Sequence, residues 1–162
     1  LDGLPMATRC GALDPGVVLH FILRLEWAPE RVESMLYRES GLLGMSGESA
    51  DMRQLLSSGS DAARAAIDVF VQRVASGIGA CAVNLGGLDG VVFTGGIGEN
   101  QPPIRAAVAE RLTLFGACLD ECANDAGNGP VHASDSRIEI WALPTDEEME
   151  IARGVLVALA DS

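Results

Sequence analysis

A glycine-rich stretch at residues 94–100, Thr-Gly-Gly-Ile-Gly-Glu-Asn, follows the apolar run at residues 91–93. Three glycines in four residues allow a sharp turn and let a ligand approach the backbone closely, because no Cβ is in the way. Residues 104–115 predict a helix after this turn, and a helix that opens there directs free N–H groups toward an anion such as phosphate. We therefore expect a nucleotide or phosphate site, with a tight turn that binds nothing as the alternative.

Two common phosphate-binding motifs are excluded by the residues that follow the turn. No Gly-Lys-Ser/Thr follows, so the stretch is not a P-loop. Gln101 stands where a dinucleotide fingerprint requires its third glycine. Whether the turn binds a ligand must therefore be inferred from the other candidate residues.

An acidic sequence, Thr-Asp-Glu-Glu, opens the last predicted helix at residues 145–148. Thr145 and Glu148 have the spacing of a capping box, and Asp146 suits the positive end of the helix dipole. This interpretation leaves Glu147 free. Mg²⁺ is commonly bound by only one or two carboxylates together with water and phosphate oxygens. Glu147 is therefore a candidate metal ligand, with a purely structural acidic cap as the alternative.

Two further segments carry charged residues suited to phosphoryl chemistry. Arg9 lies in the loop sequence Ala-Thr-Arg-Cys-Gly and has no acidic neighbour in the chain. A guanidinium that reaches a transferring phosphoryl group accelerates transfer by roughly 10³–10⁵, whereas most such arginines are merely solvated. Asp51, Met52 and Arg53 either cap a helix or line one edge of a nucleotide.

Composition limits the class of protein. The chain has 162 residues, 48% of them hydrophobic, which is enough for a folded domain with an aliphatic core. Its net charge is −12 and it contains no lysine, which argues against general binding to nucleic acid or to an anionic membrane. No run of 18 apolar residues predicts a membrane span. Four cysteines without disulfide or zinc spacing favour a reducing cytoplasm.

The pattern of elements predicts an α/β protein. We expect helices at residues 17–26, 30–38, 61–85 and 104–115, a short helix from Ser49 or Asp51 to about residue 57, and a last helix from Thr145 to about residue 159. Strands are predicted at residues 89–94 and 137–143, with a possible third at 116–119, and loops at 40–47 and 120–133. The β-α-β-α order from residue 89 predicts parallel strands.

Two aspects of this pattern concern packing. Two clear strands are too few for an independent sheet, so we expect sheet partners, and a larger protein, outside this chain. Apolar residues of the first helix are predicted to lie on one face: Val17, Val18, Phe21, Ile22 and Leu25. Small residues in the second half of the long helix, from Ala75 to Leu85, favour a core position over an interface.

With these residues in place, the chain resembles the C-terminal part of acetate kinase over nearly its whole length. Each match alone is weak, but five matches in the family's order with similar spacing are specific. The matches are Thr8-Arg9-Cys10-Gly11 with Asp14-Pro15, Ser40-Gly41-Leu42-Leu43-Gly44, Asp51-Met52-Arg53, Val92-Phe93-Thr94-Gly95-Gly96-Ile97-Gly98-Glu99-Asn100, and Pro144-Thr145-Asp146-Glu147-Glu148.

The resemblance implies the actin/Hsp70/sugar-kinase (ribonuclease H-like) fold, in which two similar α/β lobes flank a cleft. Residues 1–60 would form a helical and loop segment of the C-terminal lobe, and residues 61–162 its α-β-α-β-α nucleotide-binding part. The implied activity is reversible phosphoryl transfer between ATP and acetate, giving acetyl phosphate and ADP, with Mg²⁺, in a cytoplasmic homodimer. The N-terminal lobe of the same protein would be a partner that this chain lacks.

Roles carry over residue by residue. Arg9 matches the arginine that stabilises the transferring phosphoryl group, and Glu147, rather than Glu148, matches the magnesium-associated carboxylate. The segment at the adenosine side of the nucleotide corresponds to Asp51, Met52 and Arg53. The second nucleotide-contacting loop corresponds to Gly96, Ile97, Gly98, Glu99 and Asn100.

Departures from the family pattern leave alternatives open. Ala7 stands where the family commonly has glycine, and Ala12 where it commonly has aspartate, on either side of Arg9. The resemblance implies that the family's catalytic aspartate, acetate-site arginine, phosphate-contacting histidine and first phosphate loop would precede Leu1. A propionate or butyrate kinase, or a non-catalytic nucleotide-binding or dimerisation module, is therefore the alternative to an acetate kinase.

Overall fold

The structure is a computed structural model that describes residues 1–160, apart from the side chains of residues 147 and 160. The chain forms two compact units. The first unit comprises residues 1–88 and 107–114, and the second unit comprises residues 89–106 and the chain from residue 115 onward. The expected division of roles at residue 60 stays a prediction.

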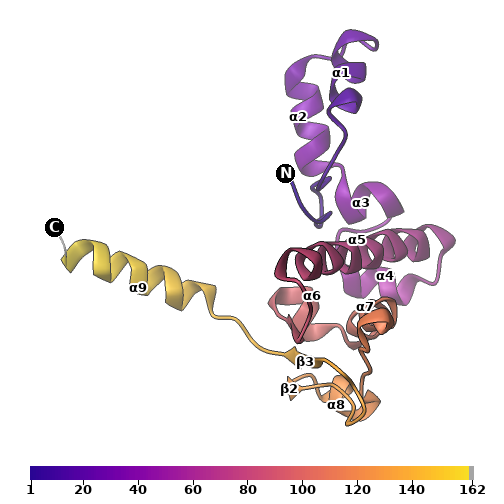
Figure 1. The fold of residues 1–162 in the computed structure, drawn as a ribbon. Helices are drawn as coiled ribbons and strands as arrows, with labels where there is room; N and C mark the ends of the chain where they lie inside the picture. The colour runs from indigo at the N-terminus through magenta and orange to yellow at the C-terminus, as the bar shows by residue number, and fades with distance from the viewer. Residues whose placement is uncertain (161–162) are drawn as a thin grey trace. The chain divides into compact units, whose positions relative to one another are not determined.

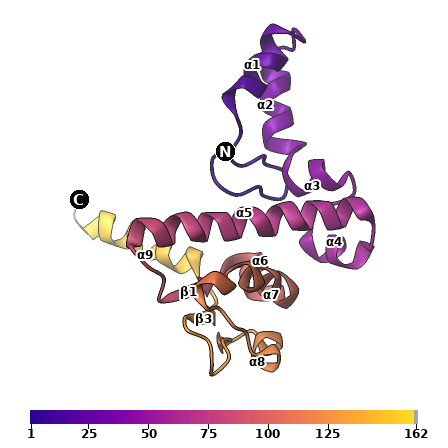
Figure 2. The same ribbon diagram turned by 45° about the vertical axis from the view of Figure 1, so that its right-hand side comes forward.

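The first unit is helical (Figures 1 and 2). Its helices are α1 (Pro15–Leu23), α2 (Pro29–Arg38), α3 (Gly41–Ser46), α4 (Met52–Ser58), α5 (Asp61–Leu85) and the C-terminal half of α7 (Pro102–Arg111). Both α3 and α4 pack against α5, and α1 contacts α2. The core of this unit consists of aliphatic side chains and one aromatic: Val32, Leu36, Leu42, Met52, Leu55, Ala63, Ala66, Phe70, Val71, Val108 and Leu112.

Local signals account for most of these helices. Asp14 accepts a hydrogen bond from the Gly16 amide (2.7 Å) and Pro15 is the first residue of α1, so this helix spans residues 15–23 and not the predicted 17–26. Ser60 caps α5 through the Ala63 amide, and Gly86 ends it in the left-handed conformation. The predicted bounds of α5 are therefore confirmed, and those of α2 differ by one residue.

The prediction of a loop at residues 40–47 is wrong, because residues 41–46 form α3. No side chain caps α3. Its first amides instead donate to main-chain carbonyls far back in the chain: Ser40 to Thr8 (3.0 Å), Leu42 to Met6 (2.9 Å) and Leu43 to Ala7 (3.0 Å). A helix whose caps come from such a distant segment carries no local signal in its own sequence.

The apolar face of α1 is not buried, and the prediction of a core position for the second half of α5 is wrong. The first helix, α1, contains no buried residue, and Phe21 stacks on Trp27 with ring centroids 4.7 Å apart. In the second half of α5 only Ala75 and Ala82 are buried, whereas Val83 is 80% exposed and Leu85 is 77% exposed. The apolar spacing of α5 continues beyond the part of the helix that the first unit covers.

Among the described helices, α5 is the one that is long and apolar enough to cross a membrane, with a mean hydropathy of 1.4 over 18 residues. A single helix of this kind is weak support for a membrane span, because the core helix of a soluble protein meets the same condition.

The second unit contains a small sheet in the order β1-β3-β2. Strand β1 (Gly90–Phe93) pairs in parallel with β3 (Glu139–Ala142), with Val91 opposite Ile140, and β2 (Gly129–Pro130) pairs antiparallel with β3. The parallel pairing confirms the prediction from the β-α-β-α order. Helices α6 (Gly95–Asn100), α8 (Glu121–Ala126) and α9 (Glu147–Ala160) and the N-terminal half of α7 complete the unit.

Several predictions in this unit need correction. The glycine-rich stretch is not the sharp turn that was predicted, because residues 95–100 form the helix α6. The predicted helix at 104–115 begins at Pro102 and ends at Arg111, followed by the short 3-10 helix η1 (Thr113–Phe115). The predicted loop at 120–133 contains α8, which Asp120 caps through the Ala123 amide (2.8 Å), and β2. Residues 116–119 form no strand beyond an isolated bridge from Leu119 to His132.

The capping box predicted for the last helix is not formed. The Met149 amide donates to Asp146 Oδ1 (2.9 Å), so Asp146 caps α9. The Thr145 amide and hydroxyl donate instead to Glu99 (2.9 and 3.0 Å). The argument that assigned Glu148 to a cap and so singled out Glu147 therefore fails, and Glu147 rests on the resemblance alone.

Candidate functional site

The loop that carries Arg9 is held against α2 and α3 by hydrogen bonds on both sides of the arginine. The Cys10 amide donates to the Leu36 carbonyl (3.2 Å), and the Thr8 hydroxyl donates to the Tyr37 carbonyl (2.9 Å). The Met6 amide donates to the Arg9 carbonyl (3.0 Å) and closes the loop on itself. These bonds, with the three that cap α3, fix the Arg9 backbone within the first unit.

Gly41 brings α3 very close to this loop. It has a φ of 63°, and a Cβ built on it would lie 2.1 Å from the Met6 carbonyl oxygen and 2.7 Å from that of Arg9. Both neighbours are backbone atoms, which cannot rotate away. The position therefore requires glycine for its space as well as for its left-handed conformation.

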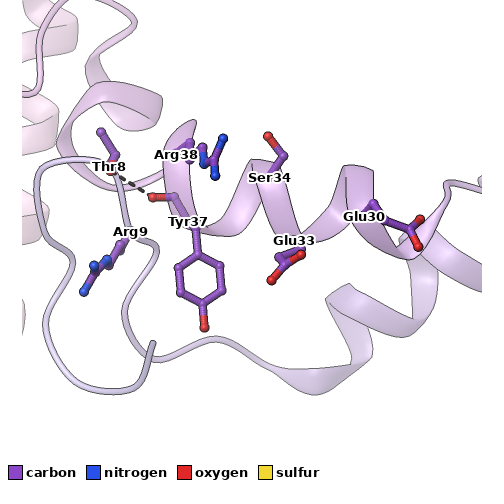
Figure 3. Close-up of a pocket in the computed structure, with 7 residues that line it drawn as sticks. All are labelled: Thr8, Arg9, Glu30, Glu33, Ser34, Tyr37 and Arg38. Carbon is purple, nitrogen blue, oxygen red and sulfur yellow. Dashed lines mark hydrogen bonds between the residues drawn. The ribbon is translucent and has the colours of Figure 1, made fainter.

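The Arg9 side chain opens onto a pocket of about 480 Å³ in the first unit (Figure 3). Its guanidinium carbon lies 6.0 Å from the centre of the Tyr37 ring, at the outer range of a cation–π contact. Arg9 is exposed, and no ion pair joins it to another residue in the described part of the chain. The pocket is lined by Thr8, Arg9, Glu30, Glu33, Ser34, Tyr37 and Arg38.

The segment 51–53 caps a helix, which is one of the two roles expected from its sequence. Asp51 accepts from the Arg53 amide (2.9 Å) as the cap of α4 and forms an ion pair with the Arg53 guanidinium (2.6 Å). The hydrogen bonds from the Arg53 side chain lower the pKa of Asp51. Met52 is 3% exposed, so its side chain belongs to the core. A nucleotide contact by this segment stays a prediction. Because the Met52 side chain is buried, Met52 could contact a nucleotide only through its backbone atoms.

In the segment 96–100, two polar side chains bond to the protein itself. Glu99 Oε1 accepts from the Gly95 amide (2.8 Å) and from the amide and hydroxyl of Thr145 (2.9 and 3.0 Å). These bonds, that from the Thr145 amide above all, lower the pKa of Glu99. Asn100 donates from its side chain to the Gly96 carbonyl (3.0 Å). Nucleotide binding by Gly96, Ile97 and Gly98 stays a prediction.

Arg105 contacts the candidate segment 96–100 and was not identified from the sequence. It is fully buried, and burial lowers the pKa of its guanidinium. The guanidinium donates to the carbonyls of Gly98 and Glu99 (2.8 Å each), to Asn124 Oδ1 (2.8 Å) and to the Asn124 carbonyl. The carbonyl end of α6 is thus fixed from inside the second unit.

The sequence did contain a signal for this burial. Ile104, Val108 and Leu112 are apolar at helical spacing, and Arg105 lies beside them on the same side of the helix. An arginine on a buried face needs acceptors for its donors. Here they are supplied by Asn124 and two main-chain carbonyls, and none of these acceptors can be identified from local sequence.

The candidate residues fall into the two units. Arg9 and the segment 51–53 belong to the first unit, and the segment 96–100 and Glu147 belong to the second. The side chain of Glu147 lies outside the described atoms, although its backbone begins α9. Among the residues described, no cluster of three or more His, Cys, Asp or Glu side chains could hold a metal ion.

The chain matches the model of the acetokinase family over residues 1–153. It is 51% identical to an acetate kinase of Rhodopseudomonas palustris (strain TIE-1) over 157 residues, which are 96% of this chain and 39% of that protein. An Entamoeba histolytica acetate kinase structure is 32% identical with a TM-score of 0.88, over 95% of this chain and 42% of that one. A Francisella tularensis propionate kinase structure is 35% identical with a TM-score of 0.86, over 93% and 40%.

These similarities confirm the expected fold class, that of the acetate and propionate kinases. The chain spans about two fifths of the length of its curated relatives, 39% for the Rhodopseudomonas protein. With 153 residues matched to one family model and about half of all residues identical to a curated relative, the chain belongs to the acetokinase family.

Proposed function

We propose that the complete protein containing this chain transfers the γ-phosphoryl group of ATP reversibly to acetate, forming acetyl phosphate and ADP. The observation that carries the proposal is the continuous match over residues 1–153 to the acetokinase family, together with 51% identity to a protein named acetate kinase. Similarity over residues 1–153 supports a shared activity better than any single motif does.

The reaction makes few covalent demands on the protein. A carboxylate oxygen of acetate attacks the γ-phosphorus, and the bond from that phosphorus to the β–γ bridging oxygen breaks, so no proton has to move. Catalysis then depends on positioning and on neutralising the charge of the equatorial oxygens. Arg9 is suited to this task because its guanidinium is exposed and carries no ion pair among the described residues, while its backbone is firmly held.

Nucleotide and metal contacts are assigned to the remaining segments. In this proposal residues 51–53 lie at the adenosine side of the nucleotide, and residues 96–100 contact it through their backbone. The carboxylates at the start of α9, Asp146 and Glu147, are oxygen donors of the kind that Mg²⁺ takes one or two of. Bound Mg²⁺ would neutralise phosphate charge, and Glu147 is the residue proposed to hold it.

The test is acetate-dependent formation of ADP from ATP by the complete protein. Arg9→Ala is expected to lower turnover by roughly 10³-fold or more, since it removes the charge that stabilises the transferring group. Arg24→Ala removes an exposed arginine of the same unit and serves as the matched control. Turnover of Arg9→Ala within a few-fold of the parent would show that Arg9 does not have this role.

A propionate kinase is the second candidate, favoured by the structural similarity to the Francisella propionate kinase. Rates with acetate, propionate and butyrate at equal concentrations discriminate the two, because a wider acyl pocket tolerates the longer chains. ATP binding by calorimetry with no transfer to any of the three carboxylates would instead favour a non-catalytic nucleotide-binding module.

The proposal also includes a cytoplasmic location and a homodimer. The exposed apolar residues Val83 and Leu85 at the end of α5 support an assembly, because a second copy could cover them. Light scattering of the complete protein at micromolar concentration measures its mass, and a monomer at every concentration would contradict the dimer.

A further inference from the structure

We propose that the side chain of Glu99 is a positioning group that holds the glycine-rich segment and the start of the last helix in one fixed arrangement, rather than a group that contacts the nucleotide. The inference rests on the proposed function, since it assigns a role within that site. It changes the role expected for Glu99 from its sequence alone.

The first argument is where the hydrogen bonds of the Glu99 side chain go. Every one goes to a single oxygen, Oε1, which accepts from the Gly95 amide (2.8 Å), the Thr145 amide (2.9 Å) and the Thr145 hydroxyl (3.0 Å). Thr94 Oγ1 adds a longer bond of 3.4 Å to the same atom. A carboxylate oxygen with this many donors is committed to the protein, and hydrogen bonds to charged groups are among the stronger ones.

The second argument is what those donors belong to. Gly95 is the first residue of α6, which contains the proposed nucleotide segment, and Thr145 precedes by two residues the proposed metal ligand at the start of α9. These segments are 46 residues apart in the chain. The bonds to Thr145 therefore fix the distance between two pieces of backbone that a bound nucleotide and its metal would use together.

The third argument is that the main chain of Glu99 is itself fixed by a hydrogen bond. Its main-chain carbonyl accepts from the buried guanidinium of Arg105 (2.8 Å), which also binds Asn124. Arg105 is fully buried, so its guanidinium is shielded from solvent. A continuous chain of hydrogen bonds thus runs from α8 through Arg105 and Glu99 to the backbone before α9.

The bonds of Glu99 do more than cap a helix. The Gly95 bond alone would only close α6 on itself, since Glu99 lies four residues later in the same helix. The Thr145 bonds contribute nothing to α6 and are not needed by α9, because Asp146 caps that helix through the Met149 amide. Their consequence is the connection between the two segments.

The test uses the complete protein with Glu99→Gln, which keeps the size of the side chain but removes its charge. We expect the KM for MgATP to rise about tenfold, since charge-assisted hydrogen bonds are roughly twice as strong as neutral ones, while the KM for acetate stays within about twofold. Glu139→Gln is the matched control, because it neutralises a glutamate of the same unit that accepts one hydrogen bond from Trp141 (3.0 Å).

A second variant removes one of the two bonds that form the connection. Thr145→Val keeps the branched shape and the amide but deletes the hydroxyl that donates to Glu99. We expect a smaller rise of about threefold in the KM for MgATP, and less than the product of the two effects in the double variant, because both changes act on one bond. This variant also decides the question if Glu99→Gln fails to fold.

Amide hydrogen exchange provides a readout that does not depend on activity. In Glu99→Gln the amides of Gly95 and Thr145 should both exchange about tenfold faster, because they share the weakened acceptor. If the KM for MgATP rises in Glu99→Gln while Thr145→Val and the exchange rates match the parent, Glu99 contacts the nucleotide directly and the inference is wrong. An inactive parent with faster exchange in the variant would refute the proposed function and leave the connection standing.

Discussion

Two glycines of the first unit have almost the same backbone conformation but different surroundings, and they form a matched pair. Gly41 has a φ of 63° and Gly47 a φ of 66°. A Cβ at Gly47 would meet nothing within 4 Å, whereas at Gly41 it would lie 2.1 Å from the Met6 carbonyl oxygen and 3.0 Å from the Arg9 nitrogen. Substituting alanine at each position separates the strain of the conformation from the effect of the contact.

The conformational part is the same at both sites, about 1–2 kcal/mol for a residue with a Cβ in the left-handed region. Gly47→Ala should therefore destabilise the protein by about that much. Gly41→Ala adds an overlap with backbone that no rotamer change relieves, and overpacking typically costs a further 1–3 kcal/mol or so. We expect Gly41→Ala to be less stable than Gly47→Ala by about 2 kcal/mol.

The function should separate the two variants further. Relief of the overlap at Gly41 requires the main chain at Met6 and Arg9 to move, so the Arg9 guanidinium is displaced and turnover should fall about tenfold or more. Gly47→Ala leaves that loop in place. Urea denaturation of the complete protein measures the stability difference, and acetate-dependent ADP formation at saturating substrates measures turnover.

Equal loss of stability and equal turnover in the two variants would refute this reasoning. That result would mean that the loop carrying Arg9 yields to a methyl group without consequence. The hydrogen bonds from Ser40, Leu42 and Leu43 to the loop would then not fix its position.

Three further substitutions test separate features. Arg105→Lys should destabilise the protein by about 2 kcal/mol or more, because an ammonium cannot serve all four bonds of the buried guanidinium, whereas Arg153→Lys at an exposed ion pair should change urea stability by under about 0.5 kcal/mol. Glu26→Gly should raise urea stability by about 0.5 kcal/mol, since Glu26 has a φ of 54° and glycine relieves that strain more than it frees the unfolded chain; no gain would contradict this. Hydrogen bonds from two serine hydroxyls lower the pKa of Glu48, so its contribution is present above the ordinary carboxyl pKa and lost as pH falls through the lowered value. The stability gap between the parent and Glu48→Gln should therefore close on acidification, and a gap that stays constant from pH 7 to acid would contradict the reasoning.

Elements with local signals could be predicted from the sequence. The helices α2, α4 and α5 and the paired strands were found because their caps, apolar periods and glycine stops lie within their own residues. Helix α3 was missed for the opposite reason, whereas α6 and α8 were missed although Glu99 and Asp120 stabilise them locally. Amides of α3 are satisfied by the carbonyls of residues 6–8, and at the start of α6 the Gly95 amide is satisfied by the side chain of Glu99.

The candidate site divides in the same way. Residue types singled out Arg9 because the sequence offers it no acidic neighbour. Among the described residues no ion pair holds its guanidinium, and its role in phosphoryl transfer stays a prediction. Asp51 and Arg53 bind each other, which the sequence allowed but could not decide. The buried Arg105 was overlooked because its acceptor Asn124 lies 19 residues away. In each case the sequence does not identify the partner, because the two residues come close only when the chain folds.

At the start of the last helix, Thr145 bonds to Glu99 and not to Glu148, the partner that the sequence predicted. A capping box between Thr145 and Glu148 would have used Thr145 within its own helix. Because Asp146 caps α9 instead, Thr145 is available to Glu99, and the bond crosses 46 residues of chain. The absence of the capping box removes the local reason for choosing Glu147. The Thr145–Glu99 bonds that form in its place hold the start of α9 beside the glycine-rich segment. A substitution at Glu99 therefore tests whether these two segments form one site, which neither segment could indicate by itself.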